Sequence, residues 1–292
     1  MNRLDDNTLE KKAFEDWSVI IRSRVSVFDV NLKEIWQYRY LIYLFVRRDF
    51  VAKVKQTVLG PIWFIIQPLL TTVMFAIVFG KIAKIPTDGL PKMLFYMSGV
   101  VSWTYFSNCL NATSTTFISN ANIFGKVYFP RLSIPISIVI SNLINFSIQF
   151  LFLLSLIFFF RVRGTQVNPN IFVLIIPFLI ILMAGLGLGF GIIVSSLTTR
   201  YRDFNYLVSF GTQLWMYATP VVYPASMLPE KYKIFVMVNP LAPIIETFRY
   251  ALLGAGTVSF VYLVYSLCFT AAVLFIGILV FNKVGKTFMD TV

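Results

Sequence analysis

The feature of this sequence that most constrains its fold is a set of six long stretches without a charged side chain. Among the 292 residues, Asp, Glu, Lys and Arg are all absent from 56–80, 93–125, 132–160, 164–199, 204–229 and 250–282. A helix needs roughly 20 mostly apolar residues to cross a bilayer, and each stretch can hold one such helix. The sequence therefore predicts an all-α integral membrane protein, with six transmembrane helices in a domain at 56–292.

The composition excludes several classes of function. Hydrophobic residues make up 58% of the chain and charged residues 13%, and the net charge of +12 fits the basic cytoplasmic loops of a membrane protein better than nucleic-acid binding. The chain contains no histidine, which excludes a histidine-based catalytic triad and an imidazole metal site. Cys109 and Cys268 lie in apolar runs and are predicted to be packing residues. We expect no catalytic residue, no metal and no nucleic-acid partner.

The distribution of basic residues predicts the orientation. The first residues lack the apolar core of a secretory signal, so the spans themselves must direct insertion. Six crossings place both termini on one side of the membrane, and 17 of the 25 Lys and Arg residues fall on that side. Because basic residues are retained in the cytoplasm, we expect a multi-pass protein of the inner (plasma) membrane with both termini cytoplasmic.

Residues 1–55 are expected to form a cytoplasmic amino-terminal segment that contains an amphipathic helix. When 33–55 is wound at 100° per residue, most charged side chains fall in one arc, and a flank carries Trp36, Tyr40, Tyr43 and Phe50. The apolar centre, 40–46, is too short to span a bilayer. This pattern favours an interfacial helix that leads into the first span. The alternative is an ordinary helix packed on its neighbours.

The stretch 224–254 predicts a second non-spanning element. Its prolines break any single continuous helix, and they are Pro224, Pro229, Pro240 and Pro243. The remaining residues are largely apolar, so we expect a re-entrant extracellular helical hairpin before the last span. Such a segment is stable at membrane depth only if it is buried in protein or lines a wet cavity, and it therefore indicates a pathway.

The chain is not expected to supply its own energy or chemistry. Its charge-free stretches lack the ionisable groups that bind coupling ions. Gly285-Lys286-Thr287 is not a nucleotide-binding loop, because Val280 stands where that loop needs glycine. Energy must come from another protein, or the chain is a passive channel or scaffold. A membrane-embedded glycan-modifying enzyme is a lesser alternative, because its candidate carboxylates are isolated in the sequence: Asp49, Asp203, Glu230 and Glu246.

Aromatic side chains interleaved with polar ones predict a path for a sugar. Aromatic rings stack on the apolar faces of sugars, and neutral hydroxyls and amides bond to many hydroxyl arrangements. The candidates are Trp63, Trp103, Tyr105, Trp215 and Tyr217. The alternative is the belt of Trp and Tyr found at membrane interfaces.

Three motifs resemble one family in chain order. They are RRDF at 47–50 followed by QTVLGPIW at 56–63 and Pro68, then NIFGKVYFPR at 122–131 with Pro135, and finally NPLAP at 239–243 with Arg249. Together they resemble the permease subunits of ABC exporters for lipid-linked polysaccharides, namely O-antigen, teichoic acid and capsule. The likeness covers nearly the whole chain.

This resemblance implies a homodimer joined to two copies of a separate ATP-binding subunit, which would bind ATP and Mg. The cargo would be a polyprenyl-pyrophosphate-linked glycan, with O-antigen as first choice, and with teichoic acid, capsule or a small lipid or drug as alternatives. The helix at about 33–50 would form a gate where the pyrophosphate meets Arg47, Arg48, Lys53 and Lys55. The loop that couples to the ATPase would use Ile123, Phe124, Lys126, Val127, Phe129 and Arg131.

Overall fold

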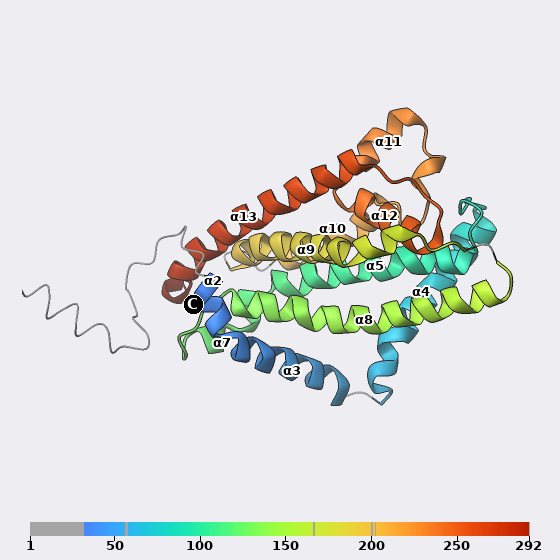
Figure 1. The fold of residues 1–292 in the computed structure, drawn as a ribbon. Coiled ribbons are helices and arrows are strands. Elements are labelled where there is room, and N and C mark those ends of the chain that lie inside the picture. Colours follow the sequence, from blue (N-terminus) through green and yellow to red (C-terminus); the bar gives the residue numbers. More distant parts are fainter. Residues whose placement is uncertain (1–31, 56–57, 166, 200, 202, 292) are drawn as a thin grey trace, which may run out of the picture. The chain divides into compact units, whose positions relative to one another are not determined.

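A computed structural model describes residues 32–55, 58–165, 167–199, 201 and 203–291, and all regular structure in these residues is helical (Figure 1). They belong to one compact unit, Leu32–Val292. The elements are α2 (Leu32–Gln37), α3 (Arg39–Lys55), η1 (Gly60–Ile62), α4 (Trp63–Phe75), η2 (Ala76–Ile82), α5 (Lys92–Ser114), α6 (Thr116–Ser119), α7 (Ala121–Phe124), α8 (Ser133–Val162), η3 (Ile171–Ile175), α9 (Ile176–Thr198), α10 (Phe204–Tyr217), η4 (Ala225–Met227), α11 (Glu230–Met237), α12 (Leu241–Leu253) and α13 (Phe260–Thr291). The part of the predicted amino-terminal segment before Leu32 lies outside the described residues.

Four helical stretches of the described chain have the length and composition to cross a membrane. They are Gly60–Ile82, Ser133–Val162, Ile171–Thr198 and Phe260–Gly285. This confirms an all-α protein with membrane-spanning character. Of the two other predicted spans, α5 has 23 residues but a more polar sequence. α10 has 14 residues, about 21 Å at 1.5 Å per residue, against a hydrocarbon core of about 30 Å. Six crossings therefore stay a prediction.

The helix α9 lies at the centre of the bundle because its glycines let two neighbours approach closely. A Cβ atom at Gly187 would lie 2.7 Å from Cys109 Cβ of α5, and one at Gly189 would lie 2.9 Å from Val273 Cγ1 of α13. In a helix, residues 187 and 189 point 200° apart. Alternate glycines thus serve opposite faces, and α5 and α13 pack on the two sides of α9.

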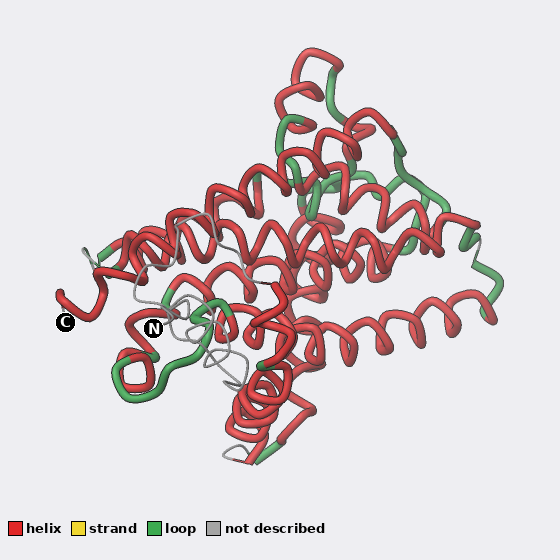
Figure 2. Tube along the Cα trace, turned by 60° about the vertical axis from the view of Figure 1, so that its left-hand side comes forward, coloured by secondary structure: helices red, strands yellow, loops and turns green. Residues whose placement is uncertain are grey.

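The two ends of the bundle carry different elements. Figure 1 places α2, α7 and the end of α13 at one end and α11 and α12 at the other, and Figure 2 shows loops gathered beside that second group. Within the predicted hairpin, 224–254, the structure forms the short η4 and the helices α11 and α12, and almost every residue of α12 is buried. Gly254 ends α12 in the left-handed conformation, at φ 78°, which glycine adopts without strain. Re-entry into a membrane stays a prediction.

The predicted amphipathic segment forms α2 and α3. One face of α3 packs along α8, and Ile42, Phe45 and Val46 are buried there. The aromatic flank at Trp36, Tyr40 and Tyr43 is exposed. The helix is therefore packed on its neighbours on one side and open on the other, and contact of the open side with a membrane surface stays a prediction.

Candidate functional site

The two arginines near the middle of α3 differ in their surroundings. Arg48 donates from Nε and Nη2 to Asp49 Oδ1, each at 2.9 Å, and its guanidinium lies 5.0 Å from the Phe45 ring centroid. Arg47 is exposed, and among the described residues it has no ion pair. Asp49 thus pairs with Arg48 rather than with Arg47, and of these two arginines Arg47 is the one available to an anion.

The two lysines at the end of α3 also differ. Lys53 Nζ donates to Asn142 Oδ1 of α8 at 3.5 Å, so this ammonium is turned toward the bundle. Lys55 is exposed. The four basic residues predicted to meet a pyrophosphate therefore lie on one helix but do not form one cluster. Their role in binding a pyrophosphate stays a prediction.

The predicted coupling loop is anchored by its own phenylalanines. Phe124 and Phe129 stack with ring centroids 5.7 Å apart, and Phe129 lies 5.8 Å from Phe45 of α3. Phe124 also contacts Phe117, which stacks on Phe281 of α13 at 4.4 Å. These rings form a buried cluster where α3, the loop and α13 meet. Phe124 and Phe129 therefore fill a space in this chain itself rather than the groove of another protein.

The tip of the loop is exposed. Lys126 and Val127 are exposed, and Ile123 is half-buried. Arg131 packs inward, with its guanidinium 6.0 Å from the Phe124 ring centroid. The surface available to a partner thus centres on Lys126 and Val127.

A polar contact joins this loop to α2. The Tyr128 hydroxyl donates to Glu34 Oε1 at 3.4 Å. Partial burial and the nearby Glu34 carboxylate raise the pKa of Tyr128 above its ordinary value, so the phenol keeps its proton at neutral pH and stays a donor. The loop and the segment α2–α3 therefore contact each other at both Tyr128 and Phe129.

The predicted sugar-path tryptophans come together in the bundle. Trp103 of α5 and Trp215 of α10 have ring centroids 6.5 Å apart. Trp215 also contacts Phe106 and Phe190, edge-to-face, at 5.3 and 5.4 Å. Edge-to-face pairs are a preferred aromatic geometry, and Trp103 is only 6% exposed. Within one subunit these rings hold α5, α9 and α10 together.

The other three aromatic candidates lie apart from this group. Tyr105 is 2% exposed and packs on Phe146 of α8 at 5.0 Å. Trp63 begins α4 and is 46% exposed, and Tyr217 ends α10 and is 50% exposed. Trp63 and Tyr217 are open to another molecule, whereas Trp103 and Tyr105 are occupied by internal packing. A role for any of them along a sugar path stays a prediction.

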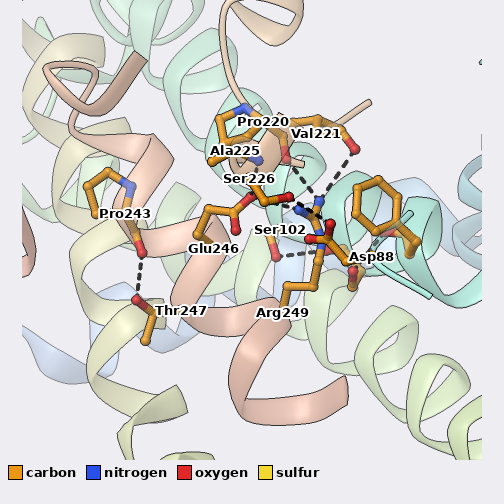
Figure 3. Close-up of polar contacts among 12 residues, drawn as sticks. Asp88, Ser102, Pro220, Val221, Ala225, Ser226, Pro243, Glu246, Thr247 and Arg249 are labelled. Carbon is orange, nitrogen blue, oxygen red and sulfur yellow. Dashed lines mark hydrogen bonds and ion pairs between the residues drawn. The ribbon is translucent and has the colours of Figure 1, made fainter. Parts of the chain in front are cut away.

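A buried ion pair lies at the end of the bundle that carries α11 and α12 (Figure 3). Arg249 Nη1 donates to Glu246 Oε1 at 2.9 Å, and each side chain is 1% exposed. Arg249 Nη2 donates to the carbonyl oxygens of Pro220 and Val221 at 2.9 and 3.5 Å. The guanidinium lies 3.9 Å from the ring centroid of Phe95 of α5. Glu246 is therefore paired with a cation on its own helix.

This pair joins three elements. The Ala225 amide, at the first residue of η4, donates to Glu246 Oε1 at 3.3 Å. Gly99 of α5 leaves the room that the arginine needs, because a Cβ atom there would lie 3.2 Å from Arg249 Nη2 and 2.9 Å from the Val221 carbonyl oxygen. Arg249 thus fastens α12 to α5 and to the chain that follows α10. Glu246 and Arg249 stand three apart on one helix, and that spacing is the signal by which the sequence could have shown the pair.

No group of three or more Cys, Asp or Glu side chains in the described part of the chain is placed to hold a metal ion. The predicted site residues that are exposed on this subunit include Arg47 and Lys55 of α3, Lys126 and Val127 at the loop tip, and the aromatic rings of Trp63 and Tyr217.

Comparisons with known proteins agree along most of the chain. The family described as ABC-2 type transporter matches residues 40–253. An O-antigen export system permease protein RfbA from Klebsiella pneumoniae is 28% identical over 89% of this chain and 99% of its own length. One of the same name from Myxococcus xanthus is 25% identical over 75% of this chain and 82% of its own length. The polysialic acid transport protein KpsM from Escherichia coli is 21% identical over 77% of this chain and 85% of its own length.

The matched region begins in α3 and ends with α12, so it includes the cationic helix, the loop, the aromatic rings and the buried ion pair. The chain belongs to the ABC-2 type transporter family.

Proposed function

We propose that this chain is the membrane-spanning permease subunit of an ATP-driven exporter that moves lipid-linked polysaccharide out of the cytoplasm across the inner membrane. The cargo proposed is O-antigen on a polyprenyl pyrophosphate carrier. The observation that carries this proposal is the likeness to an O-antigen permease over 99% of that protein's length. The proposed assembly is a homodimer with six spans per subunit, both termini in the cytoplasm and two ATP-binding partner subunits.

The geometry supports an entrance at α3. A pyrophosphate carries several anionic oxygens, and a guanidinium binds two of them at once through parallel hydrogen bonds. Arg47 is exposed and unpaired by any described carboxylate, so it is proposed as the main contact, with Lys55 as a second cation. Arg48 and Lys53 are held by Asp49 and Asn142 and are proposed to support α3.

The geometry supports different roles for the aromatic candidates. A channel between two subunits is lined by side chains that are exposed on each subunit, so Trp63 and Tyr217 are proposed to face the glycan. Trp103 and Tyr105 are proposed to support the helices behind that surface. The partner ATPase is proposed to dock on Lys126 and Val127, which the loop presents outward.

Export of an anionic glycan is a second candidate, because the matched relatives include a polysialic acid transport protein. Its lower identity and coverage place it behind the first. The cargo chemistry separates the two. Deletion of the gene should remove the polysaccharide from the cell surface and leave its lipid-linked form inside the cell. Analysis of that trapped glycan identifies the cargo, and normal surface polysaccharide in the deletion strain would contradict the proposed function.

A further inference from the structure

The middle of α8 carries three buried carboxamides, at Asn142, Asn145 and Gln149. Their exposed fractions are 4, 7 and 5%. At 100° per residue they fall within about 60° of one another, on a face that packs against other helices. We call these three side chains the polar seam. They lie in the charge-free stretch 132–160. A helix that only faced lipid would not need buried carboxamides, so these side chains require another explanation.

Each seam residue has an atom whose hydrogen bonding is incomplete. Asn142 Nδ2, Asn145 Oδ1 and Gln149 Oε1 are buried and have no hydrogen-bond partner among the described residues. The Ser137 hydroxyl on the same helix avoids this cost by donating to the Ile134 carbonyl at 2.7 Å, whereas the hydroxyls of Ser133 and Ser141 are also buried without a partner among the described residues. A buried polar atom without a partner is costly, and native proteins almost always supply one.

The position of the seam excludes bulk water as the partner. Asn142 and Gln149 are the tenth and seventeenth residues of the 30-residue helix α8. At 1.5 Å per residue they stand roughly 14 and 24 Å along an axis of about 45 Å. That is the middle of a helix long enough to span a membrane, where the surrounding lipid offers no hydrogen bonds. The missing partner must therefore be held inside the protein.

Two other elements border the seam. Lys53 Nζ of α3 donates to Asn142 Oδ1 at 3.5 Å. On α5, Tyr105 packs on Phe146, which stands between the seam residues on α8, with ring centroids 5.0 Å apart. Cys109 follows one turn further along α5, and it is fully buried. Side chains from α3 and α5 thus border the polar seam of α8.

We propose that ordered water fills a site between α3, α5 and α8 and completes the hydrogen bonds of the polar seam. Water fits because the seam residues are at most 7% exposed, and because water can both donate to the carbonyl oxygens of Asn145 and Gln149 and accept from the amide of Asn142. Asn142 and Gln149 stand about 10 Å apart along α8, so the site needs more than one water molecule. The site lies directly beside the Lys53 contact, so α3 rests on a hydrated surface of the bundle rather than on a dry one.

Radiolytic footprinting tests this proposal. The full-length chain, purified with its associated subunits and held in lipid nanodiscs, is given brief X-ray pulses in water labelled with ¹⁸O, and incorporated label is located by mass spectrometry. Bound water yields hydroxyl radicals beside it, so Tyr105 and Cys109 should be labelled several-fold faster than Met183 of α9. All three side chains are at most 2% exposed, and methionine and cysteine are both readily oxidised.

A double variant tests whether the seam residues hold the water. Changing Asn145→Leu and Gln149→Leu together removes two of the groups that hold the water, so labelling of Tyr105 and Cys109 should fall toward that of Met183. The matched control, Ser147→Leu, changes an exposed residue of the same helix and should leave the labelling as in the wild type. Wild-type labelling of Tyr105 and Cys109 no faster than that of Met183 would overturn the proposal, even if the double variant failed to fold. Undiminished labelling in a folded double variant would overturn it as well.

Discussion

At the scale of single residues, the entrance surface depends on which cation is already paired. Asp49 occupies Arg48, whereas Arg47 is exposed. A hydrogen bond to a charged group contributes about 1.5–3 kcal/mol, so Arg47→Gln should weaken binding of the lipid pyrophosphate roughly tenfold or more. Arg48→Gln should have a smaller effect. Arg47→Lys should fall between them, because lysine keeps the charge but lacks the planar fork. The measurement is surface polysaccharide against intracellular lipid-linked glycan.

Asp49→Asn provides the internal control for this prediction. It releases the Arg48 guanidinium one residue from Arg47, so it should restore part of the export lost in Arg47→Gln. Equal defects in Arg47→Gln and Arg48→Gln, with no effect of Asp49→Asn, would show that pairing in α3 does not decide which arginine meets the substrate.

The Glu246–Arg249 pair predicts a non-additive loss of stability. Removing one partner of a buried ion pair leaves an uncompensated charge and costs about 3–5 kcal/mol. Glu246→Met and Arg249→Met should therefore each lower the melting temperature strongly in detergent. The double variant Glu246→Met with Arg249→Met should be closer to the wild type than Arg249→Met alone is. Additive losses would mean that the two side chains act independently.

The contacts of a single residue could be predicted only where its partner lies nearby in the sequence. The Arg48–Asp49 contact joins neighbours in the chain, so the sequence alone can suggest it. Phe124 and Phe129 were predicted to face another protein because nothing in the sequence shows Phe45 and Phe281 arriving beside them from distant helices. Lys53 was predicted to face the substrate for the same reason, since its partner Asn142 is 89 positions away.

At the scale of elements, the close packing of α9 on α5 makes Gly187 sensitive to the smallest side chain. Gly187→Ala would place a methyl group 2.7 Å from Cys109 Cβ and 3.1 Å from the Phe106 carbonyl oxygen. Overpacking of this kind costs about 1–3 kcal/mol. Gly211→Ala on α10 is the matched control, because no atom lies within 4 Å of its Cβ position. Thermal unfolding should show a clear loss for the first variant only, and equal melting temperatures would contradict the packing described.

The loop between α7 and α8 predicts which positions reach a partner subunit. Val127 is 61% exposed and Phe124 is 7% exposed. A cysteine at Val127 should therefore cross-link to the co-expressed ATP-binding subunit in membranes, whereas a cysteine at Phe124 should not. Cross-linking from Phe124 but not from Val127 would mean that the loop unfolds from its own cluster when it docks.

The elements themselves were predictable where length and composition decide the outcome. Four charge-free stretches contain helices that are both long enough and apolar enough to span. The longest helix in the stretch 204–229 is α10, with 14 residues, because the chain turns at 218–224, around Pro220 and Pro224. The stretch 93–125 continues past α5 into the short helices α6 and α7. The absence of charged residues predicts apolar surroundings, but it does not predict where a helix ends.

At the scale of the whole molecule, each end of the bundle joins several elements through a few contacts. At one end, phenylalanines connect α3, the loop and α13. At the other, Arg249 connects α12, α5 and the chain after α10. Between them, α9 packs tightly on α5 and α13. We expect ATP-driven motion to displace α3 and the loop together, because Tyr128 and Phe129 contact α2 and α3 directly.

The most direct test of the proposed function is ATP-driven movement of lipid-linked glycan into inside-out membrane vesicles. The vesicles contain this chain with its ATP-binding partner, and a glycosidase that cannot cross membranes digests any glycan left outside. The account predicts that ATP makes the glycan resistant to the enzyme only when both proteins are present. Protection by this chain alone without ATP, or none when the complete complex hydrolyses ATP, would contradict the account.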